Sequence, residues 1–388
     1  MTDALFITGL TVHGENNPFK NAGLLIKQGK IEKIVTTAQE KIPHAQTIAF
    51  PSSCHLIPGI IDLFAHGAKG ADVMDGTAEA LETITSALPQ EGVTSILAAT
   101  MTQTYDKIEQ AIINAKRFSQ QQYTGAEILG VYLEGPFLAP SKAGAQAPHM
   151  IKKPDLAIFE HWQNLSDNFI KLATVAPEQE GALNFIEQVQ KQGVIVSAAH
   201  TDASYEQGLA AIDKGCTHAT HLFNAMSGLN HKNPGMAAAA LLDDRVSVEL
   251  IVDGIHLPEA NLKLSLKCKP KDKILLVSDA IRAKYLPDGN YELGGQQITV
   301  KDSIARTADG ALAGSLLKMN EAMRNMQRMT GCDFSDLIRF ACENPAKELG
   351  IFAHKGSIKV GKDADLTVLD DNFQVLMTIK NGTIIYRR

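Results

Sequence analysis

Apolar residues follow two different patterns along the chain. Near each end, short runs of β-prone residues alternate with turns, and Asn381-Gly382 between two such runs is typical of a tight hairpin. These runs cover residues 5–7, 23–26 and 31–35 near the N-terminus, and 357–360, 365–369 and 378–385 near the C-terminus. We therefore predict that residues 1–57 and 355–388 together form one small β-sandwich domain, which the chain leaves and later rejoins.

Between the two ends, apolar runs alternate with stretches of helical periodicity. Eight runs are present, at 56–63, 94–99, 128–133, 170–175, 194–198, 218–222, 246–252 and 273–277. Stretches such as 77–90 and 105–121 have the spacing of amphipathic helices. This alternation predicts the α/β class, with a (β/α)₈ TIM barrel over residues 58–354. An open doubly wound sheet is the alternative, but no glycine-rich phosphate loop follows any of the runs.

Polar residues of types that are common in active sites follow most of these predicted strands. In chain order they are His66, Thr100, Glu134, Glu178, His200, His221, His256 and Asp279. A residue directly after a barrel strand points into the mouth of the barrel, where active sites lie. The sequence therefore predicts one site that is assembled from several repeats.

Three of these residues form a candidate metal site. Neutral imidazole is the commonest zinc ligand, and His200 and His221 follow neighbouring predicted strands. Glu134 follows an apolar strand, where a carboxylate is costly to bury unless it is paired or bound to a cation. Together they match the His₂Glu arrangement of catalytic zinc sites, although each residue alone is compatible with a structural role.

Asp279 ends the eighth strand, where a carboxylate can take the proton of a water molecule activated by the metal. The alternative is that Asp279 caps a following helix. His66 is a candidate further ligand or a residue that lines the site, and His256 is a candidate substrate contact. His218 has an odd spacing from His221, which places the two on opposite faces of a strand, so we predict a structural role for His218.

Composition and net charge limit the classes of protein and the kinds of partner that fit this chain. The 388 residues are 45% hydrophobic and 21% charged, which excludes collagen-like, disordered and disulfide-scaffold classes. A net charge of −6 predicts neither a nucleic-acid partner nor an anionic membrane partner. Three features predict a cytoplasmic protein. The five cysteines are widely spaced and form no C-x-x-C motif, the sequence starts without a signal-peptide pattern, and no apolar run reaches about 18 residues.

Several short motifs lie at the ends of the predicted strands and near the C-terminus. They are Pro58-Gly59-Ile60-Ile61-Asp62, Leu133-Glu134-Gly135-Pro136-Phe137, Ala199-His200-Thr201, Thr220-His221-Leu222-Phe223-Asn224-Ala225-Met226, Asp253-Gly254-Ile255-His256, Ser278-Asp279-Ala280, Leu312-Ala313-Gly314-Ser315 and Gly361-Lys362-Asp363-Ala364-Asp365-Leu366. With these motifs the chain resembles the amidohydrolase superfamily over almost its whole length, and within it the deacetylases of phosphorylated amino sugars.

The resemblance implies a metal-dependent hydrolase that removes the acetyl group from N-acetyl-D-glucosamine 6-phosphate. It implies one divalent metal ion on Glu134, His200 and His221, with Zn²⁺ expected and Fe, Co or Mn as alternatives, and Asp279 as the acid and base. Implied substrate-binding residues are Ala145, Gln146, Asn224, Ala225, Lys232, His256, Leu312, Ala313 and Gly314. The partners implied are a small phosphorylated amino sugar and a second copy of the chain in a homodimer, with the loop at 223–236 near that copy.

The chain departs from the usual pattern of these deacetylases at three places. Phe64-Ala65-His66 stands where many members have His-x-His, so we expect one metal ion instead of two. Gln146 and Lys232 stand where His and Arg are usual, and Lys lacks the bidentate fork that suits phosphate. Three alternatives therefore remain open: another N-acetylhexosamine substrate such as the galactosamine epimer, another amidohydrolase reaction such as deamination, and a degenerate barrel without catalysis.

Overall fold

The computed structural model describes residues 4–36 and 42–388. Eight parallel strands form one curled sheet in the spatial order β6, β9, β10, β11, β12, β13, β14, β15. Their bounds are β6 (Ile60–Ala65), β9 (Val93–Ala99), β10 (Glu127–Leu133), β11 (Ile170–Val175), β12 (Ile195–Ala198), β13 (Cys216–Ala219), β14 (Ser247–Leu250) and β15 (Ile274–Leu276). A parallel bridge between Ala65 and Ala280, next to a 2.9 Å hydrogen bond from the Asp279 N–H to the Phe64 carbonyl, closes the barrel. The predicted TIM barrel is confirmed.

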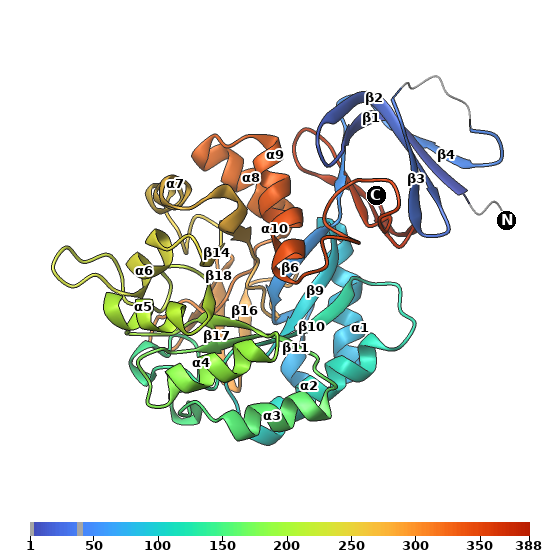
Figure 1. Cartoon of the computed structure of the whole chain (residues 1–388). Coiled ribbons are helices and arrows are strands. Elements are labelled where there is room, and N and C mark those ends of the chain that lie inside the picture. The colour runs from blue at the N-terminus through green and yellow to red at the C-terminus, as the bar shows by residue number, and fades with distance from the viewer. Residues whose placement is uncertain (1–3, 37–41) are drawn as a thin grey trace.

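Helices pack around the outside of this sheet, as Figure 1 shows. Their bounds are α1 (Ala78–Ala87), α2 (Tyr105–Ser119), α3 (Leu156–Leu165), α4 (Ala182–Lys191), α5 (Tyr205–Asp213), α6 (Met236–Leu242), α7 (Glu259–Cys268), α8 (Met319–Thr330), α9 (Phe334–Ile338) and α10 (Asn344–Glu348). Local signals fix where they begin: the Thr77 side chain caps α1, and Ser204 and Gln207 form a capping box at α5. No described helix is long and apolar enough to cross a membrane.

Strands from both ends of the chain meet in a second, mixed sheet, as predicted. Its order is β21, β20, β19, β5, β1, β2, β3, and β4 also pairs with β1. The strands are β1 (Ala4–His13), β2 (Pro18–Lys27), β3 (Lys30–Val35), β4 (Gln46–Ala49), β5 (His55–Pro58), β19 (Leu366–Leu369), β20 (Val375–Lys380) and β21 (Thr383–Arg387). The sheet has its own apolar core, which includes Ile7, Leu24, Leu366 and Met377. The first and last described strands, β1 and β21, therefore lie in one unit beside the barrel (Figure 1).

The apolar run at 56–63 is two strands, so the prediction of a single strand there was wrong. β5 belongs to the terminal sheet and β6 to the barrel, and Gly59 separates them. The Gly59 N–H donates to the Asp365 carbonyl at 2.8 Å, and a Cβ on Gly59 would lie 2.2 Å from the Thr94 Oγ1. Only glycine fits this close approach, where the chain passes from one sheet to the other.

Two small antiparallel sheets flank the barrel mouth. β7 (Gly67–Ala68) and β8 (Ala71–Asp72) follow the first barrel strand, and β16 (Gly289–Leu293), β17 (Gln296–Lys301) and β18 (Ile304–Thr307) follow the last. The three-stranded insertion packs against Met101 and Ala313, and its Gln296 side chain donates to the Ala145 carbonyl at 2.6 Å. The insertion therefore supplies one wall of the pocket described next.

Candidate metal centre and substrate pocket

A pocket of about 350 Å³ opens at the carboxyl ends of the barrel strands. Its size lies in the range of small-molecule sites. It is lined by His66, Met101, Glu134, Ser141, Lys142, Gly144, Ala145, Gln146, His200, His221, Asn224, Ala225, Ile251, His256, Asp279, Leu293, Ala311, Leu312 and Gly314. Of the predicted site residues, Ala313 and Lys232 do not line this pocket: Ala313 is buried in the small apolar core behind it, and Lys232 is exposed.

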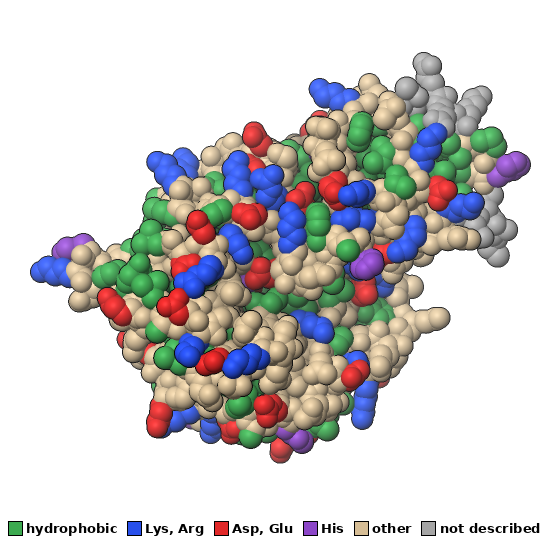
Figure 2. All heavy atoms as spheres, viewed as in Figure 1, with side chains coloured by type: hydrophobic (Ala, Val, Ile, Leu, Met, Phe, Trp, Pro, Cys, Tyr) green, Lys and Arg blue, Asp and Glu red, His purple; other side chains and the backbone are tan. Residues whose placement is uncertain are grey.

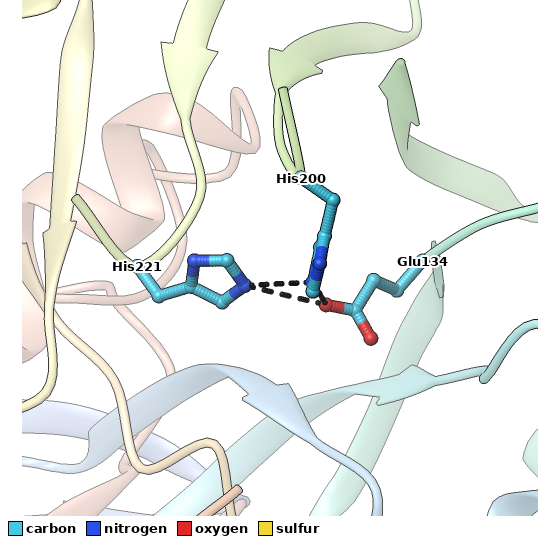
Figure 3. Close-up of side chains that lie close together, drawn as sticks. All are labelled: Glu134, His200 and His221. Atoms are coloured by element: carbon cyan, nitrogen blue, oxygen red, sulfur yellow. Dashed lines mark hydrogen bonds and ion pairs between the residues drawn. The ribbon is translucent and has the colours of Figure 1, made fainter. Parts of the chain in front are cut away.

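Glu134, His200 and His221 converge on one point of this pocket (Figure 3). The Glu134 Oε1 lies 3.1 Å from the His200 Nε2 and 3.4 Å from the His221 Nε2, and the two Nε2 atoms are 3.2 Å apart. All three side chains are buried. Among the described residues, they form the group of histidine, cysteine and carboxylate side chains that could hold a metal ion.

Hydrogen bonding fixes the ring of His200 in the form that a metal requires. Its Nδ1 lies 2.8 Å from the Lys142 carbonyl, which only accepts hydrogen bonds, so the Nδ1 carries the proton. In the neutral imidazole the Nε2 lone pair then faces the Nε2 of His221 and the Oε1 of Glu134. A lone pair that faces a carboxylate oxygen is satisfied by a proton or by a cation, and a backbone carbonyl on the remote nitrogen is typical of metal-bound histidine. The donor set therefore fits a divalent ion.

The backbone turns sharply where these side chains leave their strands. His200, His221 and Asp279 all have φ in the left-handed region, at 45°, 32° and 50°. Residues other than glycine adopt this region at a cost, and it is found where the surrounding structure holds the chain, often at functional sites. The turn directs each side chain away from the strand direction and into the mouth of the barrel.

Charge in the site favours an ionised Glu134. Burial alone would raise the pKa of this carboxyl, but hydrogen bonds to His200 and His221 hold the pKa well below its ordinary value. Glu134 is therefore a carboxylate at neutral pH, the form that ligates a cation.

His66 lies beside the predicted acid and base, outside the group of three. Its Nε2 is 3.2 Å from the Asp279 Oδ1 and 3.7 Å from the Glu134 Oε2, and its Nδ1 is 3.3 Å from the Ala99 carbonyl. Burial opposes protonation of the ring, but the hydrogen bond to Asp279 and the charge of Glu134 raise the pKa of His66 to about 9. No helix follows Asp279, so it caps none, and His66 orients its carboxylate in the pocket.

Gln146 is buried against Glu134. Its Oε1 accepts the Thr102 N–H at 2.8 Å, which directs its Nε2 onto the Glu134 Oε2. Glu134 therefore has one oxygen among the histidines and the other held by an amide. The predicted substrate contact at Gln146 lines the pocket, but the hydrogen bonds of its side chain run to the protein.

Phe64 lies beside two histidines of the site, His66 and His221. Its ring stacks on Tyr132 at a centroid distance of 4.5 Å and lies 4.9 Å from the ring of His66 and 5.9 Å from that of His221. A hydrocarbon ring offers no lone pair to a metal, so this side of the site is apolar.

His256 reaches the pocket from the loop after β14. Its Nδ1 lies 2.6 Å from the Asp253 Oδ2, and the other oxygen of Asp253 accepts the N–H groups of Ile255 and His256. Burial alone would raise the pKa of Asp253, whereas the hydrogen bond from His256 lowers it. An ionised Asp253 therefore fixes the orientation of the His256 ring in the pocket.

Lys232 lies on a loop that projects from the barrel between β13 and α6 (Figure 1). Figure 2 shows basic and histidine side chains at the tip of this loop, where His231 and Lys232 are exposed. Asn224 and Ala225, at the start of the same loop, line the pocket. The loop thus begins inside the site and carries its lysine away from it.

The sequence did not single out several residues that line the pocket. Lys142 lines it and pairs with Asp202 at 3.2 Å, in addition to holding His200 through its carbonyl. The available signal was its position a few residues before the predicted substrate-binding residues Ala145 and Gln146. Met101 and Leu293 add apolar walls, and no residue pattern points to them because Leu293 comes from the insertion after the last strand.

A (β/α)₈ barrel that gathers a glutamate and two histidines in a pocket at its strand ends has the architecture of a metal-dependent barrel hydrolase. The model of the Amidohydrolase family matches residues 55–385, and the chain belongs to this family.

Several characterised relatives are similar over nearly the whole chain. The chain is 42% identical to an N-acetylglucosamine-6-phosphate deacetylase of Bacillus subtilis, with 100% of this chain and 98% of the relative covered. It is 37% identical to an N-acetylgalactosamine-6-phosphate deacetylase of Escherichia coli O157:H7, over 82% of this chain and 85% of the relative. A mutant N-acetyl-D-glucosamine-6-phosphate deacetylase of Mycobacterium smegmatis, solved in complex with N-acetyl-D-glucosamine-6-phosphate, superimposes with a TM-score of 0.93 at 29% identity and 99% coverage of both chains.

Proposed function

We propose that this protein is a metal-dependent deacetylase that hydrolyses N-acetyl-D-glucosamine 6-phosphate to glucosamine 6-phosphate and acetate. The observation that carries the proposal is the convergence of Glu134, His200 and His221 beside Asp279 in a pocket of small-molecule size. Relatives with this activity, aligned over the full length of the chain, support the choice of substrate.

One divalent ion, Zn²⁺ in our proposal, would be held by Glu134, His200 and His221. Such an ion acts as a Lewis acid that activates water and polarises the amide carbonyl. The ring of Phe64 and the amide of Gln146 occupy the neighbouring space, which supports a site for one ion.

Asp279 is the proton carrier in this mechanism. Its carboxylate, oriented by His66, takes a proton from the attacking water, and the remaining hydroxide adds to the acetamide carbonyl. His256, whose Nδ1 donates to the Asp253 carboxylate, offers its Nε2 lone pair as an acceptor for a hydroxyl group of the sugar. Asp279 then passes its proton to the amine nitrogen as the C–N bond breaks, so that the amino sugar and acetate leave.

Two lysines are the proposed partners of the 6-phosphate. Lys142 lines the pocket of its own chain. Lys232 lies at the exposed tip of the loop at 223–236, so we propose that it serves the pocket of a second copy in a homodimer. Leu229 on this loop is 51% exposed, a hydrophobic side chain that a partner would cover.

The alternative substrate is the galactosamine epimer, because one relative at 37% identity carries that activity. The assembled ligand set argues against a degenerate barrel, which would have no reason to keep three convergent ligands.

The test is acetate release from the 6-phosphates of N-acetylglucosamine and N-acetylgalactosamine and from unphosphorylated N-acetylglucosamine. Each is assayed as purified, after chelation and after Zn²⁺ is restored, with ammonia measured in parallel. We expect the highest kcat/KM on N-acetylglucosamine 6-phosphate, with loss on chelation and recovery with Zn²⁺. Three outcomes would contradict the proposal: faster hydrolysis of the galactosamine epimer, release of ammonia in place of acetate, and acetate release that chelation leaves unchanged.

A further inference from the structure

A second cluster of carboxylates and histidine lies buried next to the metal centre. The His218 Nε2 is 3.0 Å from the Glu249 Oε1, and its Nδ1 is 2.9 Å from the Glu348 Oε1. The side chains of His218 and Glu249 are fully buried, and Ser247 donates to the other oxygen of Glu348 at 2.8 Å. The mechanism above uses none of these groups.

Glu249 connects this cluster to a metal ligand. Its second oxygen, Oε2, accepts the main-chain N–H of His221 at 3.1 Å, and its own main-chain carbonyl accepts the N–H of Leu222 at 2.9 Å. Glu249 therefore holds two consecutive N–H groups at the point where the chain leaves β13.

His221 depends on this main-chain contact more than His200 does. The Nδ1 of His221 is buried and has no hydrogen-bond partner among the described residues, whereas the Nδ1 of His200 donates to the Lys142 carbonyl. The ring of His221 therefore lacks the hydrogen bond that orients most metal-bound histidines. Its backbone is also in the left-handed region, with φ of 32°, which requires support from the surrounding structure.

We propose that Glu249 is a positioning residue for the metal centre. It acts through the main chain of His221 and fixes the direction in which the Nε2 of that ring meets Glu134 and His200. The His218 Nε2 pairs with the other oxygen of Glu249 and holds that side chain from the opposite side. The inference rests on the metal site proposed above, but it concerns metal affinity and is independent of which amino sugar is hydrolysed.

Glu348 provides a matched control. It binds the same histidine as Glu249, from α10, but the hydrogen bonds of its side chain run to His218 and Ser247 and none reaches His221. Neutralising either carboxylate disturbs the same buried cluster, and only the change at Glu249 alters the support of a ligand.

The experiment measures the Kd for Zn²⁺ of the full-length chain and its variants, by competition with a chromophoric chelator, together with urea unfolding of the metal-free proteins. We expect Glu249→Gln to raise the Kd at least about 10-fold, because the single oxygen of an amide cannot serve both the His221 N–H and the His218 ring, as the two carboxylate oxygens do. Glu348→Gln should leave the Kd near that of the original chain, with a comparable loss of stability. Glu249→Asp keeps the charge but shortens the side chain away from the His221 N–H, so it should also weaken binding.

Equal Kd values for the original chain and both Glu249 variants would overturn the inference. An increase in Kd for Glu348→Gln as large as that for Glu249→Gln would also overturn it, because the effect would then follow stability alone. If Glu249→Gln does not fold, the comparison of Glu249→Asp with Glu348→Gln decides the question. Failure of the original chain to bind Zn²⁺ at all would instead contradict the proposed function.

Discussion

Two buried clusters are built from histidine and glutamate. The metal centre contains His221, and the inner cluster (His218, Glu249 and Glu348) contains a histidine only three residues earlier in the chain. In the metal centre, Glu134, His200 and His221 line a pocket, and two imidazole nitrogens face each other at 3.2 Å. In the inner cluster, each nitrogen of His218 faces a carboxylate oxygen, and nothing is left unpaired on the ring. In the first cluster the Nε2 lone pair of His200 faces a carboxylate oxygen, whereas in the second both ring nitrogens are paired with carboxylates. Convergent acceptors, more than residue types, therefore distinguish a metal site from a buried ion pair.

The largest expected effect is a loss of deacetylation without a loss of bound metal. Asp279→Asn should lower kcat for deacetylation by about 10²–10⁴-fold, because the amide cannot take the proton of the attacking water. Bound metal should stay at the original ratio, since Asp279 lies outside the group of three ligands. The measurements are acetate release and metal content, with the exposed Asp309→Asn as a control. Activity close to that of the original chain would remove Asp279 from the mechanism.

Much of the metal centre could be predicted because parallel strands end at the same rim of a barrel. Glu134, His200, His221 and Asp279 each follow a predicted strand, and the structure brings all four into one pocket. The alternation of apolar runs and helical stretches also predicted the barrel that places them.

The inner cluster could not be predicted, for physical reasons. Glu249 lies within an apolar run, and its partner Glu348 comes from a helix 99 residues later, so no local pattern connects them. Gln146 stays a predicted substrate contact, but the sequence did not predict its bond to Glu134, because the direction of a loop side chain depends on tertiary contacts such as the Thr102 N–H.

An intermediate effect is expected from Gln146, the amide that holds the free oxygen of Glu134. Gln146→Ala should raise the Kd for Zn²⁺ by about 10-fold or more, because Glu134 is then free to rotate away from the histidines. Gln103→Ala is the matched control: it is also a buried glutamine near the pocket, and it bonds to the Gly294 carbonyl instead of a ligand. An unchanged Kd with a raised KM for the sugar phosphate would show that Gln146 acts as a substrate contact and does not support Glu134.

The last expected effect concerns folding stability and not metal binding or activity: it is a pH dependence that belongs to the inner cluster, formed by His218, Glu249 and Glu348. Burial alone would lower the pKa of His218, but hydrogen bonds to Glu249 and Glu348 raise it from 6.5 to about 9. The folded protein therefore binds one proton more than the unfolded chain between these pH values. This contribution to stability is fully present below pH 6.5 and is lost as the pH rises through about 9, with a slope of about −1.4 kcal/mol per pH unit in between.

The slope is measured by urea unfolding of the chelated protein at several pH values from 6 to 10, with His218→Gln as the comparison. Glutamine does not titrate, so the variant should be less stable at pH 6.5 and should lose less of its unfolding free energy as the pH rises. The two clusters would then differ in what they bind: a proton in the inner cluster and a metal ion in the outer one. Parallel pH profiles for the two proteins would show that His218 is neutral in the folded state, and the inner cluster would then be an ordinary hydrogen-bonded network.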